Sequence, residues 1–186
     1  RVPVIDHSLN TTRVFAMSSP ETLSETENSN DPLRLIDVDY VQFYVGNAKQ
    51  AAYFYAQAFG FEIEQISDLT TNVREAATYL LTQGNIRFLL TTGLHPEHPA
   101  QQEVQLYGDG IKDIAFTVED SAKAYEQALK NGAESAYEPI EITDELGTVV
   151  KSGVKSFGRF VHTFISRTGK YAIENVKQRG EQFLPG

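Results

Sequence analysis

The side chains in this sequence that are able to act on a substrate or hold a metal are few and widely spaced. Its four histidines are His7, His95, His98 and His162, and it contains no cysteine. Without cysteine, a disulfide scaffold, a thiolate metal site and a cysteine nucleophile are excluded. His95 and His98 form an H-x-x-H pattern, but no further zinc ligands stand near it, so we expect a solvated loop. His162 falls in a run typical of a strand, where we expect a hydrogen-bonded structural histidine.

Activated nucleophiles and phosphate-binding loops are also missing from the sequence. No nucleophile has a base at a useful spacing. Residues 107–110, YGDG, precede a predicted strand rather than a helix, so they fit a turn and not a phosphate-binding loop. Most aromatic residues fall on the apolar face of a predicted element, and we expect them in the core. If one apolar face stays exposed, we expect another domain or subunit to cover it.

Composition and charge restrict the class of protein. The chain has 186 residues, 41% of them hydrophobic and 22% charged, which is typical of a globular protein with one domain or two small ones. No apolar run approaches the roughly 18 residues of a membrane span. A net charge of -9 disfavours nucleic acid as a partner. No segment resembles a signal peptide, so we expect the protein in the cytoplasm.

The first residues, 1–34, are predicted to be a disordered leader. Residues 18–32 contain one leucine, two prolines, four acidic residues and no basic residue, which is too little apolar surface to offset the entropy of ordering. Residues 1–17 show no sustained hydrophobic period, and His7 is expected to be unstructured there. We therefore place the start of the folded domain at residue 35.

A repeat organises the rest of the chain. VQFYVGN at residues 41–47 is followed by AKQAAYFYAQAFG, and IAFTVED at residues 114–120 is followed by SAKAYEQALKNG, so the two stretches match at an offset of 73 residues. Both begin with alternating apolar residues, which is typical of a strand with one buried face. Asn47 and Asp120 are then predicted to cap the N-termini of two amphipathic helices, and Gly60 and Gly132 are predicted to end them.

Three more strands are predicted after each helix. They span residues 61–68, 75–83 and 85–92 in the first unit, and 134–143, 148–156 and 159–167 in the second. Two β-α-β-β-β units predict an α+β domain in which a curved antiparallel sheet carries its helices on the outer face and encloses a concave interior. The units span residues 35–93 and 111–167, a linker with a short helix near 99–107 joins them, and the tail 168–186 completes a domain of residues 35–186.

These paired units resemble the vicinal oxygen chelate, or glyoxalase-like, superfamily. The stretches YVQFYVGNAKQAAYFY (40–55), YGDGIKDIAFTVED (107–120) and EQFLPG (181–186) are similar to the N-terminal domain of the 4-hydroxyphenylpyruvate dioxygenase family. The same blocks resemble the sister family of 4-hydroxymandelate synthases, and the sequence does not separate the two families.

The resemblance implies an enzyme of tyrosine catabolism that uses Fe(II) and dioxygen to convert 4-hydroxyphenylpyruvate into homogentisate and carbon dioxide. In this family two histidines and one carboxylate hold the iron, and they belong to a C-terminal domain that begins after the FLPG segment. The resemblance therefore implies that this chain is the N-terminal non-catalytic domain, inactive alone, and that the catalytic domain is not present in it. The expected partners are its own C-terminal catalytic domain and further copies in a homo-oligomer.

The resemblance also indicates where a metal site of this domain would lie. In metal-binding members of the superfamily a histidine stands seven residues before the helix N-cap, a position that here holds Tyr40 in one unit and Asp113 in the other. A set of Tyr40, Asp113 and His162 would bind Fe(II) poorly, since a neutral phenol with a pKa of about 10 is a reluctant ligand. We therefore expect no catalytic, cofactor-binding or metal-binding residue in this chain.

Two functions of other classes stay open at this point. One is a stand-alone small-molecule-binding protein of the same fold, which would hold an aromatic ligand in the concave sheet. The other is an independent metalloenzyme whose site lies at a dimer interface and uses Asp113 and His162.

Overall fold

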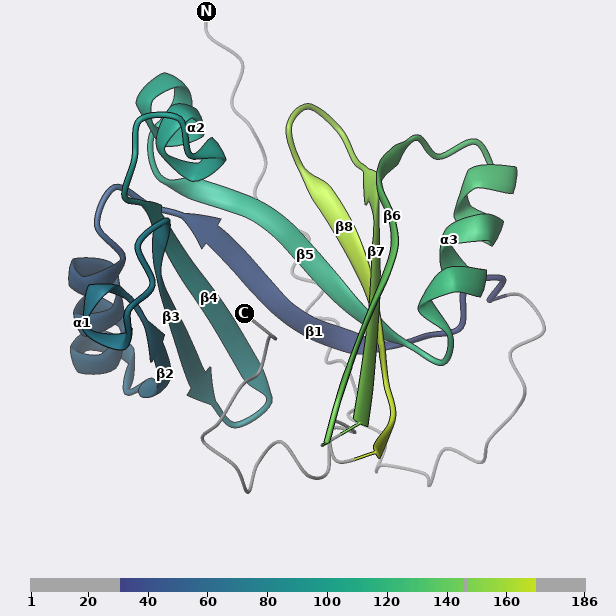
Figure 1. The fold of residues 1–186 in the computed structure, drawn as a ribbon, viewed down its shortest axis with the longest axis horizontal. Coiled ribbons are helices and arrows are strands. Elements are labelled where there is room, and N and C mark those ends of the chain that lie inside the picture. Colours follow the sequence, from purple (N-terminus) through teal and green to yellow (C-terminus); the bar gives the residue numbers. More distant parts are fainter. Residues whose placement is uncertain (1–30, 146, 170–186) are drawn as a thin grey trace, which may run out of the picture. The chain divides into compact units, whose positions relative to one another are not determined.

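The computed structural model describes residues 31–145 and 147–169, and its helices and strands follow the predicted order (Figure 1). The first unit consists of β1 (Leu35–Tyr44), α1 (Ala48–Phe59), β2 (Glu62–Ser67), a short 3-10 helix η1 (Leu69–Thr71), β3 (Ala76–Gln83) and β4 (Ile86–Gly93). Helix α2 (Pro99–Tyr107) leads to the second unit, with β5 (Gly110–Val118), α3 (Ser121–Lys130), β6 (Ser135–Asp144), β7 (Gly147–Lys155) and β8 (Val161–Arg167). The ends predicted for the three strands after each helix agree with the observed ones to within two residues, whereas β1 and β5 begin several residues before the alternating stretches that indicated them.

The eight strands of the described residues form one sheet in the order β2-β3-β4-β1-β5-β8-β7-β6. The two units meet where β1 runs antiparallel to β5, and there Val41 lies opposite Ile114, its equivalent in the repeat. Within each unit the first strand pairs in parallel with the last, β1 with β4 and β5 with β8. The predicted fold class is confirmed. The sheet is mixed rather than wholly antiparallel, because each helix returns the chain to the end at which the first strand began.

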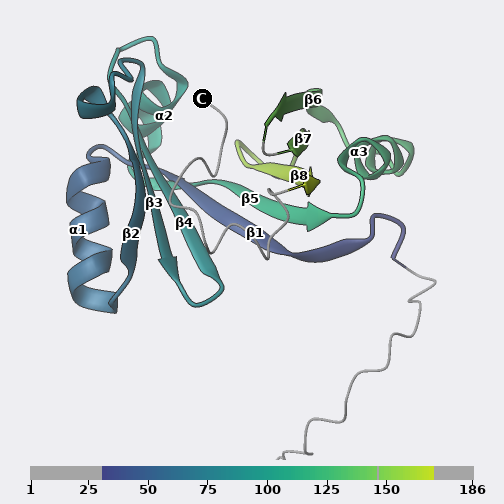
Figure 2. The same ribbon diagram turned by 60° about the horizontal axis from the view of Figure 1, so that its bottom comes forward.

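Helices α1 and α3 cover the outer face of the sheet, α1 over β2 to β4 and α3 over β6 to β8 (Figure 2). Both begin at the predicted caps: the Asn47 side chain accepts a hydrogen bond from the Gln50 N–H at 2.9 Å, and Asp120 accepts one from the Lys123 N–H at 3.1 Å. α1 ends at the predicted Gly60, at φ 77°, whereas α3 is capped by the residue before Gly132. In the described part of the chain, no helix combines the length and the apolar character that crossing a bilayer requires.

Three clusters of buried side chains form the core. One lies under α1 and one under α3. The third lies on the concave face and joins the two units; it consists of Tyr40, Leu80, Leu89, Ala115, Val149 and Ile165. Many aromatic residues pack in or against these clusters as predicted, but Tyr53, Phe54, Phe59 and Phe157 are more than half exposed.

The folded unit begins before residue 35. The carboxylate of Asp31 accepts hydrogen bonds from the backbone N–H groups of Leu33, Arg34 and Leu35 at 3.1, 2.9 and 2.9 Å. Leu33 also packs against the cluster under α3. Composition alone assigned residues 31–34 to the leader because it does not reveal the contact made by this leucine. The remaining leader residues, 1–30, and residues 170–186 of the predicted tail lie outside the described residues.

Candidate functional site

Tyr40 and Asp113, the two positions singled out in the sequence, meet at the centre of the sheet. Tyr40 lies on β1 and Asp113 on β5, and the antiparallel pairing of these strands brings both side chains to the concave face. The Tyr40 hydroxyl donates a hydrogen bond to Oδ2 of Asp113 at 3.3 Å, and both residues are buried. The repeat therefore places its two equivalent positions in direct contact.

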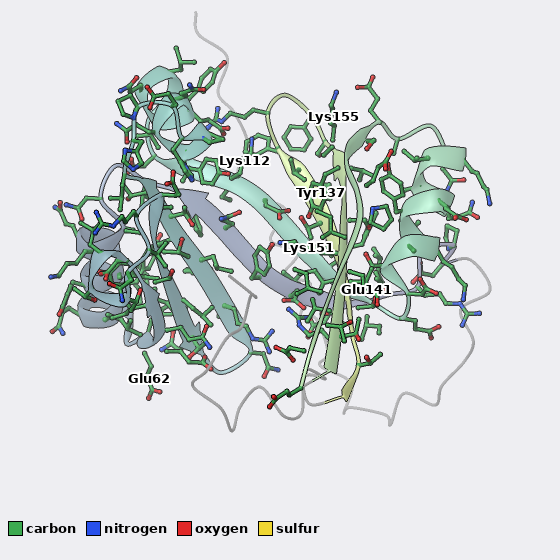
Figure 3. The ribbon with its side chains drawn as sticks, viewed as in Figure 1. Glu62, Lys112, Tyr137, Glu141, Lys151 and Lys155 are labelled. Atoms are coloured by element: carbon green, nitrogen blue, oxygen red, sulfur yellow. The ribbon has the colours of Figure 1, made fainter. Side chains whose placement is uncertain are left out.

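A buried hydrogen-bond network extends from Asp113 to strand β6. Thr163 on β8 donates its backbone N–H to Oδ1 of Asp113 at 3.1 Å and its hydroxyl to Oδ2 at 2.6 Å. The Thr163 hydroxyl also lies 2.6 Å from the hydroxyl of Tyr137 on β6, which is labelled in Figure 3. Asp113 thus accepts hydrogen bonds from β1 and β8, and the network joins both units.

Burial determines the protonation of this network. It raises the pKa of the Asp113 carboxyl, while the hydrogen bonds from Thr163 and Tyr40 act in the opposite direction. Burial, followed by the nearby charge of Asp113, raises the pKa of Tyr40 well above its ordinary value. Burial also raises the pKa of Tyr137 to about 12. Both tyrosines are therefore neutral at physiological pH and act as hydrogen-bond donors or acceptors.

The structure does not bring His162 to this network. His162 precedes Thr163 on β8, and successive side chains of a strand point to opposite faces. Its Nδ1 lies 3.1 Å from the carbonyl oxygen of Ile114, and its ring packs at 5.4 Å from that of Phe116 on the outer face. The hydrogen bond predicted for His162 is confirmed.

The residues at this site do not fit an Fe(II) centre. Such a centre needs two histidines and a carboxylate with free lone pairs. Here both oxygens of Asp113 accept hydrogen bonds, Tyr40 is a neutral phenol, and His162 faces the other side of the sheet. Among residues 31–145 and 147–169, no group of three histidine or carboxylate side chains is placed to hold a metal ion.

The other predicted histidine pattern has a structural role at one of its positions. His98 is the N-cap of α2, and its Nδ1 accepts a hydrogen bond from the Ala100 N–H at 3.1 Å. His95 lies exposed in the preceding loop, as predicted. The H-x-x-H spacing therefore reflects a loop followed by a helix cap.

A buried ion pair close to the network was not predicted from the sequence. Asp39 on β1 and Arg167 at the end of β8 form a bidentate pair, in which Nη2 of Arg167 donates to Oδ1 of Asp39 at 2.9 Å and Nη1 contacts Oδ2. Their side chains are 0% and 4% exposed. Thr117 on β5 donates its hydroxyl to Oδ2 of Asp39 at 2.8 Å. The only signal in the sequence is an aspartate inside an apolar strand, where a buried charge needs a partner.

A second polar cluster fixes α2 to the second unit. Lys112 extends from β5 towards α2 (Figure 3), where its ammonium donates to Glu103 at 2.7 Å. Arg159 donates to the same carboxylate at 2.8 Å, and its guanidinium lies 4.5 Å from the centre of the Tyr107 ring. Two cations thus share one carboxylate, which connects the linker helix to β5 and to the loop before β8.

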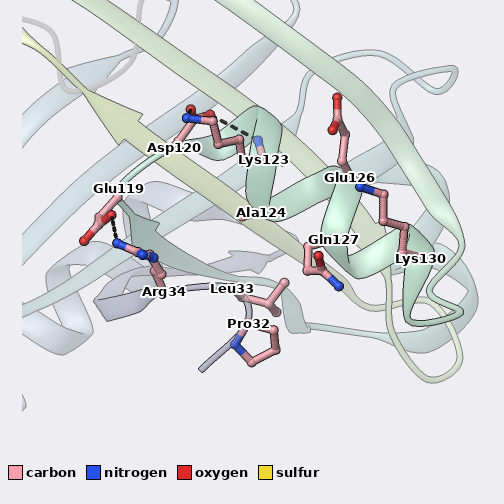
Figure 4. A pocket seen from close by; sticks show the side chains of 10 residues that line it. All are labelled: Pro32, Leu33, Arg34, Glu119, Asp120, Lys123, Ala124, Glu126, Gln127 and Lys130. Atoms are coloured by element: carbon pink, nitrogen blue, oxygen red, sulfur yellow. Dashed lines mark hydrogen bonds and ion pairs between the residues drawn. The ribbon is translucent and has the colours of Figure 1, made fainter. Parts of the chain in front are cut away.

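A pocket lies beside α3 and has a volume of about 460 Å³ (Figure 4). Its ionisable side chains are three basic and three acidic: Arg34, Lys123, Lys130, Glu119, Asp120 and Glu126. Arg34 pairs with Glu119 at 2.9 Å, and Lys123 pairs with Asp120 at 2.9 Å. Because these charges balance and largely pair with one another, the pocket has no excess charge with which to select a ligand.

Comparison with known proteins defines the family of this fold and site. Residues 37–165 match the model of the Glyoxalase/Bleomycin resistance protein/Dioxygenase superfamily. The chain belongs to this superfamily, and the resemblance stated from its motifs is confirmed.

Among curated proteins the chain is similar to 4-hydroxyphenylpyruvate dioxygenases. It is 38% identical to that of Tetrahymena thermophila over 139 residues, which cover 72% of this chain and 34% of the relative. It is 39% identical to that of Dictyostelium discoideum over 150 residues, which cover 80% of this chain and 38% of the relative. The chain therefore spans well under half the length of these relatives.

Solved structures show the same fold at lower identity. A mutant of 4-hydroxymandelate synthase from Streptomyces coelicolor superposes with a TM-score of 0.65 at 22% identity, covering 75% of this chain and 44% of that one. Methylmalonyl-CoA epimerase from Mycobacterium tuberculosis superposes with a TM-score of 0.59 at 15% identity, covering 74% and 92%. At such identities the likeness concerns the fold alone.

Proposed function

We propose that this chain is the N-terminal, non-catalytic domain of a 4-hydroxyphenylpyruvate dioxygenase. The parent enzyme would use Fe(II) and dioxygen to form homogentisate and carbon dioxide from 4-hydroxyphenylpyruvate, in the tyrosine catabolism of the cytoplasm. The relatives at 38 and 39% identity carry that name, and they extend well beyond the matched region. The 4-hydroxymandelate synthase structure, at 22% identity, gives no comparable support for the sister activity.

The observation that carries the non-catalytic assignment is the contact between Tyr40 and Asp113. These residues occupy the two positions at which the superfamily resemblance indicates metal-binding histidines, and their hydrogen bonds lock them into the sheet. Asp113 already uses three of its about four lone-pair sites within the sheet, and its neighbour Tyr40 is a phenol where a histidine would be needed, so the two residues offer a metal ion too few ligands. The network instead stabilises the join between the two units.

The role of the domain is then architectural. It would support the C-terminal catalytic domain, in which the iron ligands are expected, and would contribute to a homo-oligomer. This chain's own residues supply a rigid sheet whose concave face is filled by the apolar cluster and the two buried polar groups.

Oxygen consumption tests this proposal directly. The chain is mixed with Fe(II), ascorbate and 4-hydroxyphenylpyruvate, and the oxygen concentration is followed with an electrode, with the full-length Dictyostelium discoideum dioxygenase as the positive control. We expect no consumption above the background of the reagents. Turnover by the chain alone would refute its non-catalytic assignment.

A domain exchange tests the architectural part. The matching N-terminal region of the Dictyostelium discoideum relative is replaced by this chain, and the fusion is assayed with the same substrate. We expect turnover by the fusion, because the sheet would support the foreign catalytic domain. A folded, iron-loaded fusion without activity would contradict the proposed parent enzyme.

A further inference from the structure

The outer faces of the two units are packed differently, although the units are repeats. Under α1, the rings of Phe43, Tyr55, Phe61 and Phe88 form one cluster. The rings of Phe61 and Phe88 stack at 4.8 Å, and that of Tyr55 meets the ring of Phe88 edge-on at 5.3 Å. Phe43 adds a further edge contact to Phe88 at 5.2 Å.

Two of these rings are replaced by methyl groups under α3. Tyr55 corresponds to Ala128 at the repeat offset of 73 residues. The Phe61 N–H donates to the carbonyl oxygen of Tyr55 at the end of α1, and the Ala133 N–H donates to the carbonyl oxygen of Ala128 at the end of α3. Phe61 therefore corresponds to Ala133.

A third ring is replaced by an imidazole. Phe88 is the β4 partner of Val41, and His162 on β8 hydrogen-bonds to Ile114, the repeat equivalent of Val41. His162 therefore corresponds to Phe88. The fourth ring is kept, because Phe116 corresponds to Phe43 and lies 5.4 Å from the ring of His162.

An apolar groove lies where the rings are missing. Its volume is about 320 Å³, and Phe116, Ala128, Ala133 and His162 line it. The other lining residues are the apolar Leu33, Leu35, Val154 and Phe164 and the polar Asn131, Lys155 and Ser156. For scale, an apolar cavity of roughly 150 Å³ in a protein core holds a benzene molecule. The groove therefore admits one aromatic ring with a substituent.

Among the polar residues of the groove, Asn131 accepts a hydrogen bond from Gln127 and Lys155 pairs with Glu134, whereas His162 offers a ring nitrogen. Its Nδ1 faces a carbonyl oxygen, which only accepts hydrogen bonds, so the proton of the neutral ring is on Nδ1. Nε2 then carries a lone pair, and no described residue donates a hydrogen bond to it. A mainly apolar wall with an imidazole acceptor suits an aromatic ring that bears a hydroxyl group.

We propose that this groove is a binding site for a small phenol. The ring of the phenol takes the place that the aromatic rings of Tyr55 and Phe61 occupy in the first unit, and its hydroxyl donates a hydrogen bond to Nε2 of His162. In the first unit, aromatic rings already fit between the end of α1 and the sheet, at the position equivalent to the groove beside α3. The site lies on the face of the sheet opposite to the Tyr40–Asp113 network, so it does not depend on the proposed function.

Titration with two matched probes tests the site. 4-Methylphenol and toluene are added separately to the full chain, and binding is followed by NMR from the backbone amide signals of Phe116 and Ala128, which every variant keeps. In the wild type the imidazole signals of His162 are followed as well, assigned with His162→Gln. We expect 4-methylphenol to bind about fivefold more tightly than toluene, which corresponds to one hydrogen bond of about 1 kcal/mol. In His162→Leu, which lacks the acceptor, we expect the two probes to bind equally.

Filling the groove supplies the matched control. Ala133→Phe restores the ring found in the first unit, and we expect it to weaken the binding of both probes at least tenfold. Leu129→Phe adds the same ring to α3 outside the groove, and we expect it to leave binding unchanged. Absence of binding to the wild-type chain, or binding that persists in Ala133→Phe, would overturn the proposal. Sedimentation that shows self-association of the wild type and a monomer in Ala133→Phe would also overturn it, because the groove would then be an interface between copies.

Discussion

Replacing Arg167 by methionine removes one partner of the buried ion pair at the join of the two units. Asp39, whose side chain is 0% exposed, would keep the Thr117 hydroxyl but lose both guanidinium contacts. Breaking a buried pair on one side typically costs about 3–5 kcal/mol, because a desolvated charge is left uncompensated. A domain of this size has a free energy of unfolding of about 5–15 kcal/mol. We therefore expect Arg167→Met to remain folded in the cold but to unfold at much lower urea concentration.

A double variant distinguishes the energy of the ion pair from the energy with which its two side chains pack. In Asp39→Leu/Arg167→Met both charges are gone, and apolar replacement of a buried pair is often close to neutral. We expect the double variant to be more stable than Arg167→Met alone, with a coupling energy of about 2 kcal/mol or more. Urea unfolding followed by circular dichroism gives all four free energies of the cycle.

An exposed pair serves as the control. Arg34 and Glu119 are also joined, at 2.9 Å, but their side chains are 72% and 57% exposed. Arg34→Met should therefore change the free energy of unfolding by about 0.5 kcal/mol or less. The pair does not hold the units together if the free energy of unfolding of Arg167→Met lies within about 1 kcal/mol of that of the wild type. The same conclusion follows if the double variant is less stable than the summed effects of the two single substitutions predict.

Three further predictions concern single side chains. Burial raises the pKa of Asp113, so ionisation of this carboxyl opposes folding. The free energy of unfolding of the wild type, compared with that of Asp113→Asn, should therefore fall as pH rises from about 4. Urea unfolding curves that keep a constant difference between the two proteins would contradict this prediction. Gly153→Ala should cost about 1–3 kcal/mol, because the added methyl group would overlap the ring of Tyr137, and the cost should shrink in a Tyr137→Leu background. Asp120→Ala should lower the free energy of unfolding by about 1 kcal/mol through loss of the α3 cap. Hydrogen bonds donated by the backbone and side chain of Lys123 lower the pKa of Asp120, so this loss should disappear in acid. A loss that persists when the wild-type carboxyl is protonated would argue against the cap.

The repeat made much of the fold predictable. Matching VQFYVGN with IAFTVED identified both cap residues, Asn47 and Asp120, and the alternation of apolar residues located the strands. The same alignment indicated Tyr40 and Asp113 as equivalent positions, and the structure places them in contact. Local patterns are sufficient here because helix caps and strand faces depend on residues a few positions apart.

The buried ion pair was not predictable in the same way. Asp39 and Arg167 are 128 residues apart in the sequence and meet only because β8 pairs with β5. Alternation also assigns Asp39 and Tyr40 to opposite faces, yet both are buried. The register of β1 against β5 shifts between Val38 and Tyr40, and such a bulge places two successive residues where regular pairing would place one.

The parallel pairing and the groove were missed for different reasons. An alternating pattern has the same period in parallel and antiparallel strands, so it did not reveal that β1 pairs with β4 in parallel. The groove arises from Ala128 and Ala133, residues that carry no chemical signal of their own. Only comparison with the rings at the equivalent positions shows that side chains are missing there.

The position of the ion pair makes the two halves of the duplicated domain non-interchangeable. Asp39 belongs to the first half and Arg167 to the second, although the two halves share one order of strands and helices. Two copies of the first half, assembled in the same way, would bury two aspartates without a counter-charge, and two copies of the second half would bury two arginines. The first half therefore pairs with the second half in preference to another copy of itself. Buried charges without counter-charges would destabilise an assembly of two identical halves, which the repeat in the sequence would otherwise permit.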